Sequence, residues 1–303
     1  MKTLNLPKKV YFKNGSLPVA LRELSEVYHL RRAFLVSDPA LYRSGLVSPV
    51  GDWLRKRSLR TAEFFSIGTP PSFADVRGAL PKLLEFEPDV IVGIGGGAAM
   101  SAAKAMWALY EAPELDLAEA VDHPERIAAG TKAKLVLAAT SFGSGAQNSP
   151  FAVLKDGEGQ VRVLNSFRLL PEISVTDSCF TESLTPAQVR ACGLATLSQS
   201  IRAYAADGCC EYPQGLLREA VRLVLENLRD AEAGRPDALE KVHNAASLAG
   251  AAYGNVPFIP NPEAPPYPTD AEKASVSARV EQLAESVGFP DAQGLWNACE
   301  ALR

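Results

Sequence analysis

Residues 90–107 join an apolar strand-like run, three consecutive glycines and an alanine-rich helical pattern. The run Val90-Ile91-Val92-Gly93-Ile94 leads into Gly95-Gly96-Gly97, and the alanine-rich pattern begins directly afterwards. This order predicts a buried strand, a tight turn and a helix N-terminus, where backbone N–H groups can bind a phosphate. Triple glycine after a strand also occurs where a helix only packs closely on a sheet, and that alternative stays open.

Short apolar runs alternate with helix-like segments through the first 180 residues. Strands are expected at residues 32–38, 61–65, 90–94 and 134–139. A helix is expected at residues 76–86, despite Pro81. The alternation is typical of βαβ units, so we predict an α/β, Rossmann-like domain with a mainly parallel sheet. Ligands of such sheets bind at the carboxyl ends of the strands, where Asp38, Gly95–Gly97 and Thr140–Gly145 all fall.

The pattern becomes helical from about residue 181. Thr185-Pro186-Ala187-Gln188 is a capping box with proline at the first helical position. Helices are expected at residues 185–206, 216–228, 239–250 and 271–287. Residues 256–268 are rich in proline, which favours an extended linker or lid. We therefore predict two domains, residues 1–180 as a nucleotide-binding domain and residues 181–303 as a shortened all-helical domain.

Composition excludes several function classes. The net charge of −4 offers no basic surface for nucleic acid, and no window is apolar enough to span a membrane. The N-terminal residues lack the apolar core of a signal peptide. The five cysteines are odd in number and follow no zinc spacing, so reduced thiols in the cytoplasm are expected. They are Cys179, Cys192, Cys209, Cys210 and Cys299.

Two further features support a nucleotide site. The loop Thr140-Ser141-Phe142-Gly143-Ser144-Gly145 offers hydroxyls and flexible backbone after a predicted strand. Asp38 ends the first clear strand, where a carboxylate can accept hydrogen bonds from the hydroxyls of a ribose. An aspartate at this position is also a common helix cap or turn residue, and both interpretations remain open.

Several segments together resemble the iron-containing (group III) alcohol dehydrogenases. The likeness is carried by residues 7–12 (PKKVYF), 88–97 (PDVIVGIGGG), 102–107 (AAKAMW), 150–153 (PFAV), Asp177, Ala203-Tyr204 and 242–246 (VHNAA). The chain is similar in particular to the alcohol dehydrogenase half of bifunctional aldehyde-alcohol dehydrogenases. The resemblance implies a Rossmann-like nucleotide domain followed by an all-helical domain, with the active site in the cleft between them. It also implies NAD(P) and a divalent metal that polarises the oxygen of an alcohol or aldehyde.

The metal ligands implied by the resemblance are missing. The family carries the helix motif G-x-D-A-x-x-H-A-x-E-A, whose Asp and His face one cation because they are four residues apart. Here those positions hold Ala195 and Gln199, and Arg202 replaces the nearby glutamate. Two more histidine ligands belong to segments that the proline-rich stretch replaces. Only His29, His123 and His243 remain in the chain, and none lies at a ligand position. We therefore expect no iron or zinc.

The cofactor loops depart less from the family pattern. The family's usual G-G-G-S-P-M-D corresponds here to Gly95–Ser101, where a hydroxyl and a carboxylate are lost. In the loop that begins at Thr140, Phe142 replaces a small residue and Gln147 replaces an acidic one. Backbone contacts to phosphate survive such changes, so NAD(H) or NADP(H) is expected at reduced affinity. The candidate cofactor contacts are Asp38, Gly95, Gly96, Gly97, Ala98, Ser101, Thr140, Ser141, Ser144 and Ser149.

Three functions are compatible with these residues. The first is a catalytically degenerate relative, a structural or regulatory partner that forms a homodimer or pairs with a paralogous dehydrogenase. The second is an active NAD(P)-dependent oxidoreductase without the metal, in which Arg202 stabilises the oxyanion. The third is a sensor that binds a nucleotide or an anion at Arg202, although this side chain can equally pair with a local carboxylate. A cytoplasmic location is expected, with association to a bacterial microcompartment or enzyme complex left open.

Overall fold

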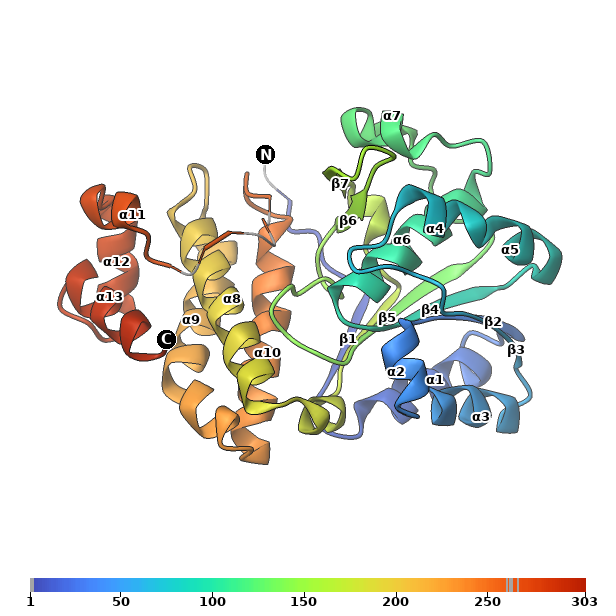
Figure 1. The fold of residues 1–303 in the computed structure, drawn as a ribbon, viewed down its shortest axis with the longest axis horizontal. Coiled ribbons are helices and arrows are strands. Elements are labelled where there is room, and N and C mark those ends of the chain that lie inside the picture. The colour runs from blue at the N-terminus through green and yellow to red at the C-terminus, as the bar shows by residue number, and fades with distance from the viewer. Residues whose placement is uncertain (1–2, 260, 262–263, 266) are drawn as a thin grey trace. The chain divides into compact units, whose positions relative to one another are not determined.

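The computed structural model describes residues 3–259, 261, 264–265 and 267–303 (Figure 1). The chain divides into two compact units. The α/β unit contains residues 7–140 and 150–177, and the helical unit contains the residues before Pro7, the loop 141–149 and residues 178–303. We expected a single domain boundary at residue 180. The observed division differs from it in one respect, because loop 141–149 packs with the helices that follow it in sequence.

The α/β unit is built on a parallel sheet of six strands in the order β1-β8-β5-β4-β2-β3. The strands are β1 (Lys9–Phe12), β2 (Arg32–Val36), β3 (Arg60–Phe64), β4 (Val90–Gly95), β5 (Lys134–Ala139) and β8 (Ile173–Thr176). Every residue of β4 is buried, as expected for a central strand covered on both faces. The predicted parallel α/β architecture is confirmed.

Helices cover both faces of this sheet. Figure 1 shows α1, α2 and α3 on one face and α4, α5 and α6 on the other. Their bounds are α1 (Ser16–Glu26), α2 (Pro39–Arg43), α3 (Ser48–Lys56), α4 (Phe73–Gly78), α5 (Leu80–Phe86) and α6 (Gly97–Glu111), followed by α7 (Leu117–Asp122) and the 3₁₀ helices η1 (Pro124–Arg126) and η2 (Phe167–Leu169). An antiparallel hairpin, β6 (Phe151–Lys155) with β7 (Val161–Asn165), forms a second sheet.

The single helix predicted at residues 76–86 is wrong, because the structure has two. The first ends at Gly78, and the second begins at Leu80 with Pro81 in its first turn. Proline lacks the N–H that a helix interior requires, and the first turn is where a helix tolerates it. The first helix also starts earlier than predicted, at a capping box formed by Ser72 and Asp75.

The helical unit is built around three long helices. The elements are η3 (Ser178–Ser183), α8 (Pro186–Ala205), α9 (Glu211–Glu232), α10 (Pro236–Tyr253), α11 (Asp270–Ala274), α12 (Ala278–Ser286) and α13 (Ala292–Ala301). The capping box predicted at Thr185 and Gln188 is present. The helix predicted at 271–287 is interrupted, because Thr269 and Ser277 each cap a separate short helix. The predicted helical second domain is confirmed.

The proline-rich stretch 256–268 lies partly outside the described residues, which omit 260, 262–263 and 266. Its last part is anchored: Tyr267 is buried, its N–H donates to Ser198 Oγ at 2.7 Å, and its hydroxyl accepts from Trp296 Nε1 at 2.9 Å. Among the described residues, no helix is long and apolar enough to cross a membrane.

Candidate functional site

The strand order places two of the predicted motifs side by side. From β2 the chain moves outward to β3, and then returns to the other side of β2 to form β4 and β5. The sheet therefore has a switch point between β2 and β4, where parallel α/β sheets commonly bind ligands. Asp38 follows β2 and Gly95–Gly97 end β4, so both lie at this point. Ser37 Oγ donates to the Ile94 carbonyl at 2.7 Å and fixes the two strand ends together.

The glycine turn serves close packing and also leaves donors at the start of α6. Gly95 has a φ of 155°, and a Cβ placed on it would lie 2.5 Å from Ala99 Cβ. The close-packing alternative is therefore real at Gly95. Gly96 is the N-cap of α6 and supplies no side-chain acceptor. Because Gly96, Gly97 and Ala98 are only half-buried, their end of α6 suits an anion.

Asp38 caps a helix and also faces the glycine turn. Its Oδ1 accepts from the Leu41 N–H at 2.9 Å and caps α2. Its Oδ2 faces the glycine turn, 3.5 Å from where a Cβ on Gly95 would be. One carboxylate oxygen therefore holds a helix, while the other is directed at the turn where a phosphate and its ribose are expected.

Ser101 and Thr140 each form a hydrogen bond that links neighbouring elements of the α/β unit. Ser101 Oγ accepts from the Val153 N–H at 3.0 Å, which fastens β6 to α6. One turn later, the fully buried Lys104 donates from Nζ to the Phe151 carbonyl at 2.7 Å. The Thr140 N–H donates to the Gly95 carbonyl at 3.0 Å, so the end of β5 supports the glycine turn. Thr140 and Ser101 are both buried.

Loop 141–149 belongs to the helical unit and is held by close backbone packing on α10. A Cβ on Gly250 would lie 2.0 Å from the Gly145 carbonyl oxygen. Asn148 Nδ2 donates to Ser247 Oγ at 2.7 Å. The ring of Phe142 packs near His243, with 6.1 Å between ring centroids. Ser141 and Ser144 are half-buried and Ser149 is buried, so these three candidate contacts sit in a loop whose course is fixed.

The face of α8 at the implied metal-ligand positions is short of donor atoms. The side chain of Ala195 is a methyl group and has no atom that can donate to a metal. Gln199 is 7% exposed, and its Oε1 is buried without a hydrogen-bond partner among the described residues. Arg202 follows three residues later, on the same helix face. A neutral amide oxygen next to a guanidinium does not fit a divalent cation, which needs several anionic or imidazole donors.

Arg202 is paired with a carboxylate from the C-terminal segment. Its Nε and Nη2 donate to the two carboxylate oxygens of Glu272 at 2.6 and 3.1 Å. The guanidinium also lies 5.8 Å from the centroid of the Tyr267 ring. Burial by itself would raise the pKa of Glu272, but Arg202 and the Thr269 cap outweigh it and hold that pKa below its ordinary value. The local-carboxylate alternative for Arg202 is thus the arrangement present.

This ion pair gives a first testable prediction. Glu272→Gln is expected to lower the free energy of unfolding by about 2 kcal/mol, since it leaves a largely buried guanidinium uncompensated. The pair Arg235–Asp230 is the matched control, because both side chains are at least half exposed. Asp230→Asn should change stability by less than about 0.5 kcal/mol. Urea unfolding of both variants at pH 7 measures the difference, and equal losses would contradict the assignment.

The histidines do not assemble a metal site. His123 is exposed and contacts Glu125, His29 is exposed, and His243 is fully buried on α10. Within the described part of the chain, no group of three or more His, Cys, Asp and Glu side chains is arranged to hold a metal ion.

Comparison with known proteins decides the family. The sequence model of the iron-containing alcohol dehydrogenases matches residues 7–178, more than half of the chain. The chain belongs to the iron-containing alcohol dehydrogenase family. The match covers the whole six-stranded sheet and the switch point.

Two relatives of this family member are aldehyde-alcohol dehydrogenases. Aldehyde-alcohol dehydrogenase 2 of Entamoeba histolytica is 37% identical over 266 residues, covering 84% of this chain and 30% of that protein. Bifunctional aldehyde-alcohol dehydrogenase AdhE of Escherichia coli K12 is 33% identical over 262 residues, covering 82% of this chain and 29% of that protein. The chain thus spans about 30% of the length of these relatives.

Solved structures share the fold of this alcohol dehydrogenase homologue. The sulfoacetaldehyde reductase of Bifidobacterium kashiwanohense, solved in complex with NAD+, has a TM-score of 0.88 at 20% identity, covering all of this chain and 85% of that one. The iron-containing alcohol dehydrogenase of Thermococcus thioreducens has a TM-score of 0.84 at 23% identity, with 100% and 85% covered. At these identities the likeness establishes the fold.

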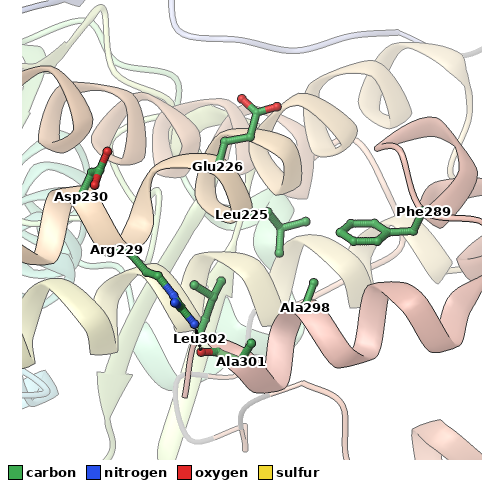
Figure 2. A pocket seen from close by; sticks show the side chains of 8 residues that line it. All are labelled: Leu225, Glu226, Arg229, Asp230, Phe289, Ala298, Ala301 and Leu302. Carbon is green, nitrogen blue, oxygen red and sulfur yellow. Dashed lines mark hydrogen bonds between the residues drawn. The ribbon is translucent and has the colours of Figure 1, made fainter.

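A surface pocket of about 410 Å³ lies elsewhere in the helical unit (Figure 2). It is lined by Leu225, Glu226, Arg229, Asp230, Phe289, Ala298, Ala301 and Leu302. Arg229 reaches across it and donates to the Ala301 carbonyl at 2.8 Å. Glu226 pairs with Arg222, and Asp230 pairs with Arg235. Its charged groups are therefore already engaged: Arg229 links α9 to α13, and the two carboxylates pair with arginines outside α13.

Sequence reasoning missed the partners of the α8 face. The sequence predicts Glu272 as part of a helix and Tyr267 as part of a linker. Neither pattern connects them with Arg202, which lies about 70 residues earlier. Thr269 and Glu272 form a capping box, which was the one available signal that an ordered helix begins there. Lys104 was noted only as part of the family pattern, and nothing local in the sequence marks it as fully buried.

Proposed function

We propose that this chain binds a nicotinamide dinucleotide but does not carry out the metal-dependent hydride transfer of its family. The observation that carries the proposal is the α8 face, where Ala195, Gln199 and an Arg202–Glu272 ion pair occupy the positions that the family likeness assigns to the metal site. Hydride transfer from an alcohol builds negative charge on oxygen, and a cation normally stabilises it. The protein then acts as a structural or regulatory partner.

The α/β unit supports nucleotide binding. The N–H groups of Gly96, Gly97 and Ala98 at the start of α6 would hold the pyrophosphate of NAD(H) or NADP(H), and Asp38 would hold a ribose hydroxyl. When bound, the nicotinamide supplies a hydride donor or acceptor. Reduced affinity is expected because the family's hydroxyl and carboxylate in the turn are replaced by Ala98 and Ser101.

The nucleotide proposal predicts that NADH fluorescence changes saturably on titration with the protein. Asp38→Asn should raise the Kd about tenfold, because asparagine still caps α2 but lacks the charge that strengthens a hydrogen bond to a ribose hydroxyl. Asp116→Asn is the matched control, since Asp116 also caps a helix but comes after the C-terminal end of α6, the end opposite to the switch point. Absence of saturation in the unaltered protein at millimolar NADH would refute binding, and equal Kd values would refute the role of Asp38.

A second candidate is a metal-free oxidoreductase that uses Arg202 as the electrophile. It is favoured by Arg202 Nη1, a buried atom with no hydrogen-bond partner among the described residues. An arginine can stabilise an oxyanion but cannot accept a proton at neutral pH. NADH oxidation with short aldehydes, abolished by Arg202→Met and kept in Arg190→Met, would establish this candidate in place of the first. No turnover in any protein would exclude it.

We also propose a homodimer, or a hetero-oligomer with a paralogous dehydrogenase, in the cytoplasm. The support is the family likeness. Light scattering after size exclusion, alone and with a purified full-length paralogue, tests it. A monomer that stays monomeric with the paralogue would contradict the proposal.

A further inference from the structure

Two aromatic rings meet at the carboxyl edge of the sheet, next to the switch point. Tyr42 lies in α2, and Phe65 follows the last residue of β3. Their ring centroids are 4.3 Å apart and the planes differ by 24°, so the rings are stacked. The Ser37 N–H donates to the Phe64 carbonyl at 3.3 Å, which fixes the end of β3 beside the end of β2.

The position of Tyr42 follows from Asp38. The Tyr42 N–H donates to the Asp38 carbonyl at 3.1 Å, so the tyrosine stands one helical turn after the capping aspartate and on the same side of α2. Asp38 Oδ2 faces the glycine turn. The glycine turn ends β4, Asp38 follows β2 and Phe65 follows β3, and these strands lie in the order β4-β2-β3. A dinucleotide with its pyrophosphate at the turn and its adenosine ribose at Asp38 is therefore directed toward the end of β3.

The Tyr42 ring is packed on one face and partly exposed elsewhere. Tyr42 is 44% exposed, although one face of its ring is covered by Phe65. A ring that is backed by a second ring and lies beside the carboxyl ends of parallel strands offers its free π-face to a ligand bound there. Every nucleobase has a π-face, and stacking on an aromatic side chain binds it without requiring a hydrogen-bond partner.

We propose that the Tyr42–Phe65 pair is the stacking platform for the adenine of the bound dinucleotide. Phe65 supports Tyr42 from one side, and the free face of the tyrosine takes the base. This inference rests on the proposed nucleotide binding and adds to it a side chain that the sequence analysis did not select. The platform binds through ring area, so it favours a purine and does not read the amino group of adenine.

The test uses ADP-ribose, which carries the adenine half of the dinucleotide and no nicotinamide. Isothermal titration calorimetry compares the unaltered protein with Tyr42→Phe, Tyr42→Leu and Tyr42→Ala, with folding checked by circular dichroism. A stacking role predicts that phenylalanine keeps the affinity, while leucine and alanine each raise the Kd about tenfold. Tyr212→Ala, which removes a 73% exposed tyrosine from α9, is the control and should leave the Kd unchanged.

The outcomes separate the platform from the binding site itself. If the unaltered protein binds ADP-ribose and leucine serves as well as tyrosine, the platform is wrong and nucleotide binding stands. If alanine also keeps the affinity, the platform is wrong for the same reason. If the unaltered protein does not bind ADP-ribose at all, both the platform and the proposed function are contradicted.

Discussion

Gly250→Ala is expected to lower the free energy of unfolding by about 2–3 kcal/mol, although alanine is the better helix former by about 1 kcal/mol. The added Cβ would lie 2.0 Å from the carbonyl oxygen of Gly145 and 2.7 Å from its Cα. Both are backbone atoms, so no side chain can rotate away to relieve the clash. Loop 141–149 would have to move off α10, which would also break the contact of Asn148 with Ser247.

The control is a glycine in a helix with free space around it. A Cβ on Gly215, in α9, meets no atom within 4 Å. Gly215→Ala should therefore raise the free energy of unfolding by about 0.5–1 kcal/mol. Urea unfolding of the two variants beside the unaltered protein measures the expected loss and the expected gain in the free energy of unfolding. A Gly250→Ala protein as stable as Gly215→Ala would show that loop 141–149 does not rest on α10 as described.

Lys104 is expected to make stability depend on pH. Burial lowers the pKa of this lysine from 10.5 to about 7. Between these values the unfolded chain holds a proton that the folded protein has released, so raising the pH favours folding. Below about pH 7 both states are protonated and the contribution is constant. Lys104 alone should therefore add about 1.4 kcal/mol to the free energy of unfolding for each pH unit between 7.5 and 9.5.

Lys104→Met isolates this effect from the other groups that titrate in the same range. Methionine keeps a long side chain in the core but carries no titrating group, while tyrosines and cysteines remain unchanged in both proteins. Urea unfolding at pH 7.5, 8.5 and 9.5 should give a smaller pH slope in the variant. Absolute stability is expected to fall as well, since the Phe151 carbonyl loses its donor. Equal slopes in the two proteins would show that Lys104 keeps its ordinary pKa when folded.

Much of the sheet was readable because its central strands are continuous apolar runs. Continuous apolar runs such as those at β2, β4 and β5 are typical of buried strands of a parallel sheet. The helix after Gly97 has a clear alanine-rich periodicity. The edge strand β1 alternates half-buried and exposed residues over four positions, and the hairpin strands β6 and β7 have mixed burial over five positions each. Such short patterns do not stand out from loops, and their pairing depends on strands far away in sequence.

The site residues also divide into those that could be predicted from the sequence and those that could not. Asp38 and the glycine turn could be predicted because each directly follows its own strand, and parallel topology brings strand ends together. The partners of Arg202 could not, because they come from a segment about 70 residues later whose path depends on tertiary packing. Sequence therefore reveals missing donor atoms at Ala195 and Gln199 more readily than it reveals what has taken their place.

Metal content is the most direct test of the claim that this family member has lost its catalytic cation. The protein should be purified from cells grown with added iron and zinc, and analysed by inductively coupled plasma mass spectrometry beside Gln199→Ala. The account predicts substoichiometric iron and zinc in both proteins, because the implied ligand positions of α8, Ala195 and Gln199, offer at most one neutral oxygen. One tightly held equivalent of either metal in the unaltered protein, lost in Gln199→Ala, would contradict it.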